Sequence, residues 1–143
     1  MEDIKYVFDV EKDDFVRAGE TSSKIKKILR ELGIDSGIIR KISIAAYEAE
    51  MNIVIHSLGG QIVLEITPGI IKITARDRGP GIADVELAMR EGYSTATEKV
   101  REMGFGAGMG LPNMKKCSDR FYVNSSEGKG TIIIIEVDLK AGE

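Results

Sequence analysis

One predicted helix carries polar side chains at a spacing that suits phosphate chemistry. Glu48, Asn52 and His56 follow one another at intervals of four residues within ISIAAYEAEMNIVIHS, residues 42–57. Because each helical residue turns by about 100°, a four-residue step drifts by only ~40°, so these side chains share one seam. The amide oxygen of Asn52 suits a hard cation such as Mg²⁺, and the carboxylate of Glu48 can orient water or accept a hydroxyl proton.

The alternative for this seam is an ordinary solvent-facing stripe. Alanine and isoleucine fill most of the remaining circumference of the helix and leave little room for water, which weakens that alternative. Glu50 lies off the seam and is expected to face solvent. For His56, a structural role in the core or at the helix end is a better expectation than catalysis.

A second candidate is the turn DRGPG at residues 77–81, directly after a predicted strand. Gly79 and Gly81 permit close approach of a planar ligand to the backbone, and Pro80 stiffens the turn between them. Asp77 could accept hydrogen bonds from an exocyclic amine. Taken alone, the segment is also consistent with a simple turn that begins at an aspartate.

A third candidate is the glycine-rich run GFGAGMGLPNMKK at residues 104–116. Its glycines occupy every second position: Gly104, Gly106, Gly108 and Gly110. Their backbone N–H groups and the positive end of a helix that begins near Leu111 make this region suitable for an anion. A flexible linker would explain the run equally well.

A fourth candidate is GKGT at residues 128–131, where a glycine turn places the hydroxyl of Thr131 at the start of the last predicted strand. By itself this is an ordinary hairpin turn.

The elements that must position these residues follow from hydrophobic periodicity and turn residues. β-Forming runs predict strands at 4–10, 61–67, 70–77, 120–126 and 131–139. Helices are expected between Asp13 or Asp14 and Gly33, from Asp35 or Ser36 to about Leu58, over 82–90 and from Leu111 to Cys117, with a long loop over 92–110. The paired hairpins indicate an α+β fold, a two-layer sandwich with a mostly antiparallel sheet and helices on one face.

Composition narrows the class of protein. The 143 residues are expected to form one domain, 1–143. A composition of 43% hydrophobic and 30% charged residues is typical of a globular protein. A net charge of −3 argues against nucleic acid or an anionic membrane as the main partner. One cysteine excludes an internal disulfide, and neither a signal peptide nor a membrane-spanning run is visible, so a cytoplasmic protein is expected.

Together and in this order, the four segments resemble the ATP-binding motifs of the Bergerat-fold superfamily, which includes gyrase-type topoisomerases, heat-shock chaperones, histidine kinases and mismatch-repair ATPases. The resemblance spans about residues 35–138. The segments EAEMNIVIH (48–56), RDRGPGIADVELAMREGYST (76–95) and SEGKGT (126–131) look most like bacterial anti-sigma-factor serine/threonine kinases and stress-switch kinases.

The resemblance implies ATP and Mg²⁺ as cofactors. Glu48 would be the general base, Asn52 the magnesium ligand and Asp77 the acceptor for the adenine amine, supported by Thr131 through water. Gly79 and Gly81 would shape the adenine pocket. The lid over the triphosphate would comprise Gly104, Gly106, Gly108 and Gly110. Arg101 is a candidate for charge on the γ-phosphate, although a solvated arginine in EKVRE (98–102) is an equally good interpretation.

The resemblance further implies a serine/threonine protein kinase that phosphorylates a small anti-anti-sigma-like antagonist protein, with a sigma factor as a further partner and a homodimer as the expected assembly. The alternative is a non-catalytic nucleotide-binding module that works as a partner switch. A structural module with a vestigial pocket is a third option. Arg17 could contact an acidic partner, although a solvated side chain is the simpler expectation.

Overall fold

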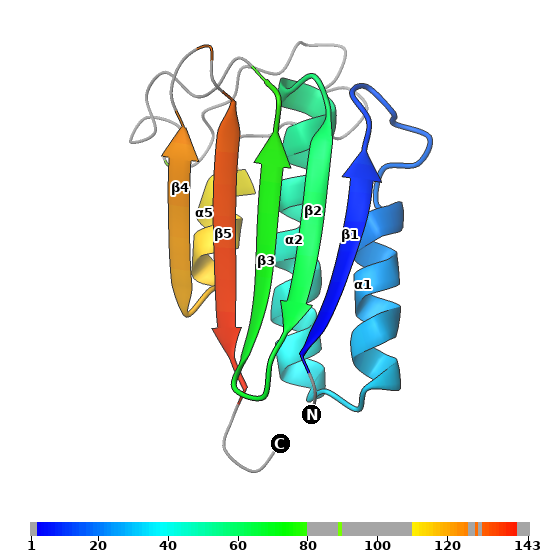
Figure 1. Cartoon of the computed structure of the whole chain (residues 1–143), viewed down its shortest axis with the longest axis vertical. Coiled ribbons are helices and arrows are strands. Elements are labelled where there is room, and N and C mark those ends of the chain that lie inside the picture. The colour runs from blue at the N-terminus through cyan, green and yellow to red at the C-terminus, as the bar shows by residue number, and fades with distance from the viewer. Residues whose placement is uncertain (1–2, 80–88, 90–109, 126–127, 129, 140–143) are drawn as a thin grey trace.

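The computed structural model describes residues 3–79, 89, 110–125, 128 and 130–139. In this part of the chain a five-stranded sheet, in the order β1-β2-β3-β5-β4, carries helices on one face (Figure 1). The strands are β1 (Ile4–Val10), β2 (Gly60–Ile66), β3 (Ile70–Asp77), β4 (Arg120–Ser125) and β5 (Thr131–Asp138). The helices are α1 (Glu20–Glu31), α2 (Ser36–His56) and α5 (Gly110–Lys116).

All four neighbouring strand pairs are antiparallel, so the predicted α+β class and the helices on one face are confirmed. The predicted strands are all present, with ends within a residue or two of the expected positions. The predicted helix over 82–90 lies outside the described residues apart from Met89, and so does the predicted loop up to residue 109. Within the described ranges, no helix combines the length and the apolar character that crossing a bilayer requires.

The core lies between the sheet and the helices. Along β2, Ile62, Leu64 and Ile66 are fully buried, while the residues between them are more exposed, as expected for a sheet with one covered face. The apolar face of α2 packs against this surface, and Ile42 and Ile53 are almost completely buried. Each such isoleucine stabilises the fold by roughly 1.5–3 kcal/mol relative to an exposed position. Packing of this face fixes the rotation of α2 about its axis.

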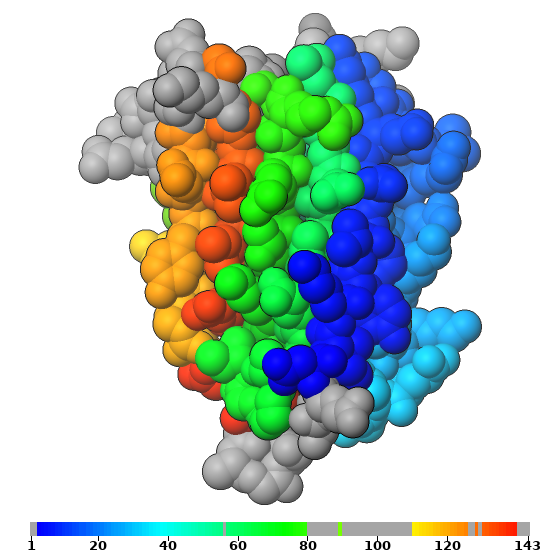
Figure 2. Space-filling view, in the orientation of Figure 1, coloured from blue at the N-terminus to red at the C-terminus, as the bar shows by residue number. Residues whose placement is uncertain are grey.

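The opposite face of the sheet is turned toward solvent, and Figure 2 shows it from the front. One row across all five strands alternates in charge, because strand register places oppositely charged residues beside each other. The members of this row are Lys5, Glu65, Lys72, Glu136 and Arg120. The guanidinium of Arg120 also pairs with both Glu136 and Asp138. This face is therefore a solvated surface in the described chain.

The start of α1 differs from the sequence expectation. Asp13 and Asp14 do not cap the helix: Asp13 has a φ of 56°, Asp14 binds the backbone N–H of Arg17, and α1 begins at Glu20. The residue at the N-cap position, Gly19, has no side chain to offer. The expected cap was wrong because the acceptor comes from another helix.

That acceptor is Glu50 of α2, and the expectation that Glu50 faces solvent was also wrong. Its side chain is only 2% exposed. Oε2 accepts hydrogen bonds from the N–H groups of Gly19 (3.1 Å) and Thr21 (3.2 Å), and Oε1 accepts one from Ser22 (3.1 Å). A helix N-terminus presents unpaired N–H groups and a positive dipole end, so it can hold a buried carboxylate. Glu50 therefore joins α1 to α2.

We predict that Glu50→Ala lowers the free energy of unfolding by about 2–4 kcal/mol, because it leaves three N–H groups at a buried helix end without their acceptor. Glu31→Ala, which removes an exposed carboxylate from the last residue of α1, should change stability by less than about 0.5 kcal/mol. Urea denaturation followed by circular dichroism measures both. Equal stabilities for the two variants would contradict the role assigned to Glu50.

Candidate functional site

Three chain segments meet at one end of the sheet. β3 ends there, β5 begins there, and the C-terminal half of α2 runs to the same end behind them (Figure 1). The short helix α5 packs beside α2. Antiparallel pairing of β3 with β5 is what places the end of one strand beside the start of the other. The residues at these termini form the candidate site.

The carboxylate of Asp77, the last residue of β3, is held in a fixed orientation. Its Oδ1 accepts hydrogen bonds from the backbone N–H groups of Gly79 (2.8 Å) and Thr131 (3.1 Å). In the described part of the chain, no hydrogen bond reaches Oδ2. The side-chain hydroxyl of Thr131 instead forms a hydrogen bond with Ser125 at 2.7 Å. Thr131 thus contacts Asp77 directly through its backbone, and a water-mediated contact of its hydroxyl stays a prediction.

Two glycines allow the backbone to pack closely around Asp77. A Cβ atom at Gly79 would lie 2.9 Å from both Cα and Cβ of Ser57, at the end of α2. Gly130 has a φ of +81°, and a Cβ there would lie 2.5 Å from the carbonyl oxygen of Asp77. Any larger residue would therefore push the turn away from α2 or from β5.

Ser57 forms the base on which this turn rests. It is buried, its hydroxyl donates to the carbonyl of Ile53 (2.8 Å), and its oxygen accepts from the N–H of Gly59 (3.0 Å). The sequence analysis did not single out Ser57. A small polar residue two positions before Gly59 is a weak helix-end signal, and only the fold shows that Gly79 packs on it.

Glu48 lies on the side of α2 that faces α5. Its side chain is half-buried, and this burial raises the pKa of the carboxyl group above its ordinary value, while a hydrogen bond with the side chain of Asn113 partly opposes the shift. A Cβ atom at Gly110 would lie 3.4 Å from Oε2 of Glu48. The last glycine of the glycine-rich run is thus next to the candidate base. Asn113 was not anticipated, although it follows Gly110 within one helical turn.

Asn52 lies one turn after Glu48 on α2 and is half-buried as well. The predicted seam is therefore neither fully exposed nor part of the apolar core. Among the described residues, no group of three or more His, Cys, Asp or Glu side chains is placed to hold a metal ion. A magnesium ion here would need oxygens from a ligand and from water to complete its octahedral shell around the Asn52 amide. That donor set fits a metal that arrives with phosphates.

The structure thus groups the described candidates into two sets connected by α2. Asp77, Gly79 and Thr131 surround the end of β3, and Glu48 and Gly110 meet where α2 faces α5. Gly81, Arg101, Gly104, Gly106 and Gly108 lie outside the described residues. His56 is the last residue of α2, and its side chain is also outside the description.

We predict that Gly79→Ala destabilises the fold by about 1–3 kcal/mol, because its methyl group overlaps Ser57. Gly69→Ala is the matched control, since a Cβ there meets nothing within 4 Å. Its unfolding free energy should stay the same or rise by less than about 1 kcal/mol. Thermal and urea denaturation compare the two, and a tolerated Gly79→Ala would refute the close packing of this turn.

Comparison with known proteins places these features in a family. Residues 37–141 match the family model described as histidine kinase-, DNA gyrase B- and HSP90-like ATPase. The chain is 35% identical over 112 residues to the serine/threonine-protein kinase RsbT of Bacillus subtilis, covering 76% of this chain and 78% of that protein.

Anti-sigma F factors are also similar. The protein of that name from Pasteuria penetrans is 38% identical over 101 residues, or 66% of this chain and 64% of the relative. The one from Caldanaerobacter subterraneus is 38% identical over 100 residues, or 66% of each chain. The chain thus spans slightly less than two thirds of the length of these two relatives. The family match covers α2, the end of β3 and the start of β5, which carry the candidate site. The chain therefore belongs to the histidine kinase-, DNA gyrase B- and HSP90-like ATPase family.

Proposed function

We propose that this protein is an ATP-dependent serine/threonine protein kinase and an anti-sigma-type regulator that phosphorylates a hydroxyl group on a small antagonist protein. The observation that carries the proposal is Glu48, a half-buried carboxylate of raised pKa that lies against Gly110 and one turn before Asn52. The names of the relatives, a serine/threonine-protein kinase and anti-sigma F factors, support the same function.

In this proposal the adenine base binds at the end of β3. Two backbone N–H groups hold Oδ1 of Asp77, so Oδ2 can accept a hydrogen bond from the exocyclic amine without any rearrangement of the side chain. Gly79 lets the turn beside Asp77 pack on Ser57, and we assign it and Gly81 to the adenine pocket as the resemblance implies. A fixed acceptor of this kind selects a base that carries an amine at the matching position.

The chemistry occurs at the other set of residues. Asn52 would hold Mg²⁺ through its amide oxygen, and the bound ion would neutralise charge on the phosphate oxygens. Oε of Glu48 would orient the acceptor hydroxyl and take its proton. Burial makes this carboxylate a stronger base than a solvated one, and the side chain of Asn113 restrains it. These residues supply positioning and proton transfer, which phosphoryl transfer requires.

The remaining candidates lie in the glycine-rich run, residues 104–116, or just before it. We include Gly104, Gly106 and Gly108, together with Gly110, as the backbone that closes over the phosphates, and Arg101 as a source of positive charge on the γ-phosphate. Their support is the alternation of glycines in the sequence and the position of Gly110 beside Glu48.

We further propose a cytoplasmic homodimer that recognises an anti-anti-sigma-like antagonist and a sigma factor. The names of the relatives support a partner-switching role. Arg17 remains 68% exposed although it pairs with Asp14 at 3.1 Å, so it stays available at the surface for an acidic partner.

We predict that Glu48→Gln reduces phosphate transfer by about a hundredfold or more with little change in nucleotide affinity, because it removes the base and keeps the shape of the side chain. Asn52→Ala should weaken both nucleotide binding in Mg²⁺ and transfer. The assay incubates the protein with labelled ATP, Mg²⁺ and an anti-anti-sigma-like antagonist protein, and calorimetry measures nucleotide affinity.

Three outcomes are distinguishable. Nucleotide binding without labelling of the antagonist would overturn the kinase proposal and favour the non-catalytic partner switch. Absence of nucleotide binding would leave a structural module. If Glu48→Gln and Asn52→Ala lose nucleotide binding and phosphate transfer to the same extent, the separate roles given to Glu48 and Asn52 are contradicted.

For Asp77→Asn we predict a selective loss of nucleotide affinity. The amide oxygen can still accept from the N–H groups of Gly79 and Thr131, so the unfolding free energy should change by less than about 1 kcal/mol. That orientation places an NH₂ group where Oδ2 stood, facing the adenine amine, and should cost about tenfold or more in affinity. Calorimetry and urea denaturation measure the two effects. A variant that binds ATP normally would remove Asp77 from the adenine site.

A further inference from the structure

One side of the short helix α5 surrounds the carboxyl group of Glu48. The helix is held in place by the buried side chains of Leu111 and Met114. Gly110 and Asn113 are three positions apart, so they lie on the same side of the helix. A Cβ atom at Gly110 would lie 3.4 Å from Oε2 of Glu48, and the side-chain amide of Asn113 donates a hydrogen bond to the same carboxylate.

The backbone that carries the Asn113 side chain is fixed by hydrogen bonds within α5. The carbonyl of Asn113 accepts from the N–H of Cys117 (3.1 Å), and the hydroxyl of Ser118 donates to the carbonyl of Met114 (2.6 Å). Asn113 lies inside the helix and does not cap its start. Asparagine is a poor helix former in such a position, so the contact with Glu48 supplies a reason for an amide here.

The amide stabilises the charged form of Glu48 without adding a positive charge. Among the described residues, no cation forms an ion pair with Glu48. Burial raises the pKa of Glu48, and the hydrogen bond from Asn113 partly lowers it again. A lysine or arginine in contact would lower this pKa much further and make the carboxylate a weaker base. A neutral donor orients the carboxylate and preserves more of its basicity.

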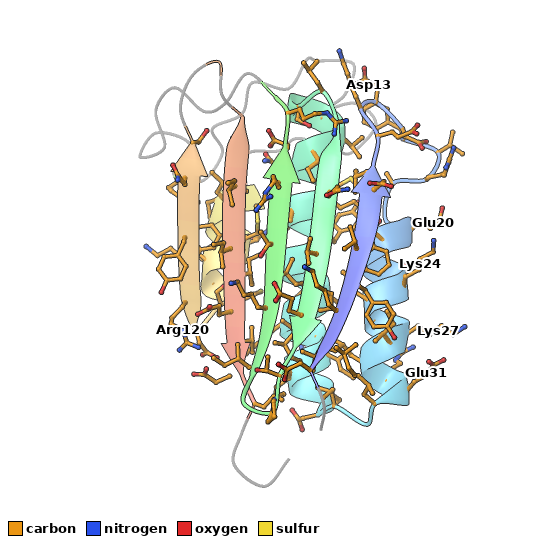
Figure 3. The ribbon with its side chains drawn as sticks, in the orientation of Figure 1. Asp13, Glu20, Lys24, Lys27, Glu31 and Arg120 are labelled. Carbon is orange, nitrogen blue, oxygen red and sulfur yellow. The ribbon has the colours of Figure 1, made fainter. Side chains whose placement is uncertain are left out.

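The cations of the neighbouring elements are directed elsewhere. Figure 3 shows Lys24 and Lys27 on the outer side of α1, and Figure 1 shows α2 between α1 and α5. Lys24 pairs with Glu20 at 3.1 Å. Arg120, at the start of β4, pairs with two carboxylates of β5. These charges therefore do not replace the amide of Asn113 as a partner of Glu48.

Three other ionisable groups surround Glu48, one from each neighbouring helix and one from its own. Lys26 of α1 lines the same groove as Glu48. Burial, followed by the charge of Glu48, raises the pKa of Tyr47 on α2. Burial also raises the pKa of the Cys117 thiol on α5; Lys41 opposes this shift and Glu48 adds to it. Tyr47 and Cys117 are therefore protonated at neutral pH, which leaves Glu48 as the anion of this cluster.

The carboxyl group of Glu48 is also accessible from the side away from α5. Together with Ser23, Ser43 and Tyr47, Glu48 lines a groove of about 410 Å³ between α1 and α2. A carboxylate has two oxygens and about four lone-pair sites. One hydrogen bond from an amide therefore leaves acceptor capacity for a hydroxyl group.

We propose that Asn113 is a positioning residue for Glu48. Its amide holds the carboxylate from the α5 side in one orientation, with free lone pairs directed toward an acceptor hydroxyl. The proposal rests on the proposed function, because it takes Glu48 as the base. α5 is also the C-terminal part of the glycine-rich run, residues 104–116. Packing of this part of the run on α2 and orientation of the base are therefore coupled through one side chain.

The first test follows the carboxyl carbon of Glu48 by ¹³C NMR as the pH is varied, in the full chain without nucleotide. The signal that is missing in Glu48→Gln identifies this carbon. Asn113→Ala removes the donor and should raise the titration midpoint of Glu48. Asn113→Asp should raise it further, because a second carboxylate disfavours ionisation. Lys115→Ala, an exposed change on the same helix, is the matched control and should leave the midpoint unchanged.

The second test measures kcat and KM with labelled ATP, Mg²⁺ and an anti-anti-sigma-like antagonist protein. Asn113→Ala should lower kcat by about tenfold or more, because a misoriented base fails in the transition state. The KM for ATP and the nucleotide affinity from calorimetry should change by less than about twofold, because the amide does not hold the nucleotide. Lys115→Ala should behave like the unaltered chain, and circular dichroism confirms that the variants are folded.

Several results would overturn the proposal. An unchanged midpoint in Asn113→Ala would show that the amide does not hold the carboxylate. A raised midpoint with an unchanged kcat would remove the positioning role, and parallel losses of kcat and nucleotide affinity would indicate a general disturbance of the site. If the unaltered chain transfers no phosphate, the proposed function fails and the positioning role fails with it. The titration distinguishes that result from loss of the contact itself.

Discussion

Helix α2 buries its isoleucine and alanine face against the sheet, and this contact determines where the other sides of the helix point. Glu48 faces α5, where it lies beside Gly110 and Asn113, whereas Glu50 faces the start of α1. A rotation of α2 by one residue would expose Ile42 or Ile53 at a cost of roughly 1.5–3 kcal/mol each. The geometry of the candidate site and the attachment of α1 therefore rest on the same packing surface.

The fold was predictable where the signals are local. The periodic isoleucines and alanines of α2, the Asp35 cap that accepts from Gly37 and Ile38, and the Pro68-Gly69 turn between β2 and β3 depend only on nearby residues. The family could also be recognised from the order of the motifs that contain Glu48, Asn52 and Asp77. The family model matches residues 37–141, which include all three. Such features can be predicted from the sequence before any long-range contact is known.

The errors and omissions concern contacts between distant segments. Glu50 looked solvent-facing, but its partners lie 28–31 residues earlier, on another helix. Thr131 reaches Asp77 through its backbone across a separation of 54 residues, so its residue type carried no information about that bond. Asn113 and Ser57 acquire their positions only when α5 packs on α2 and the β3 turn rests on the end of α2.

The joint between α1 and α2 has a consequence for how such a protein can diversify. Glu50 binds main-chain N–H groups, so its three hydrogen bonds do not require particular side chains on the exposed face of α1. The exposed positions of α1 can therefore change through mutation while the helix keeps its place. A lineage of regulators can in this way acquire new protein recognition on one helix without disturbing the neighbouring helix that carries Glu48.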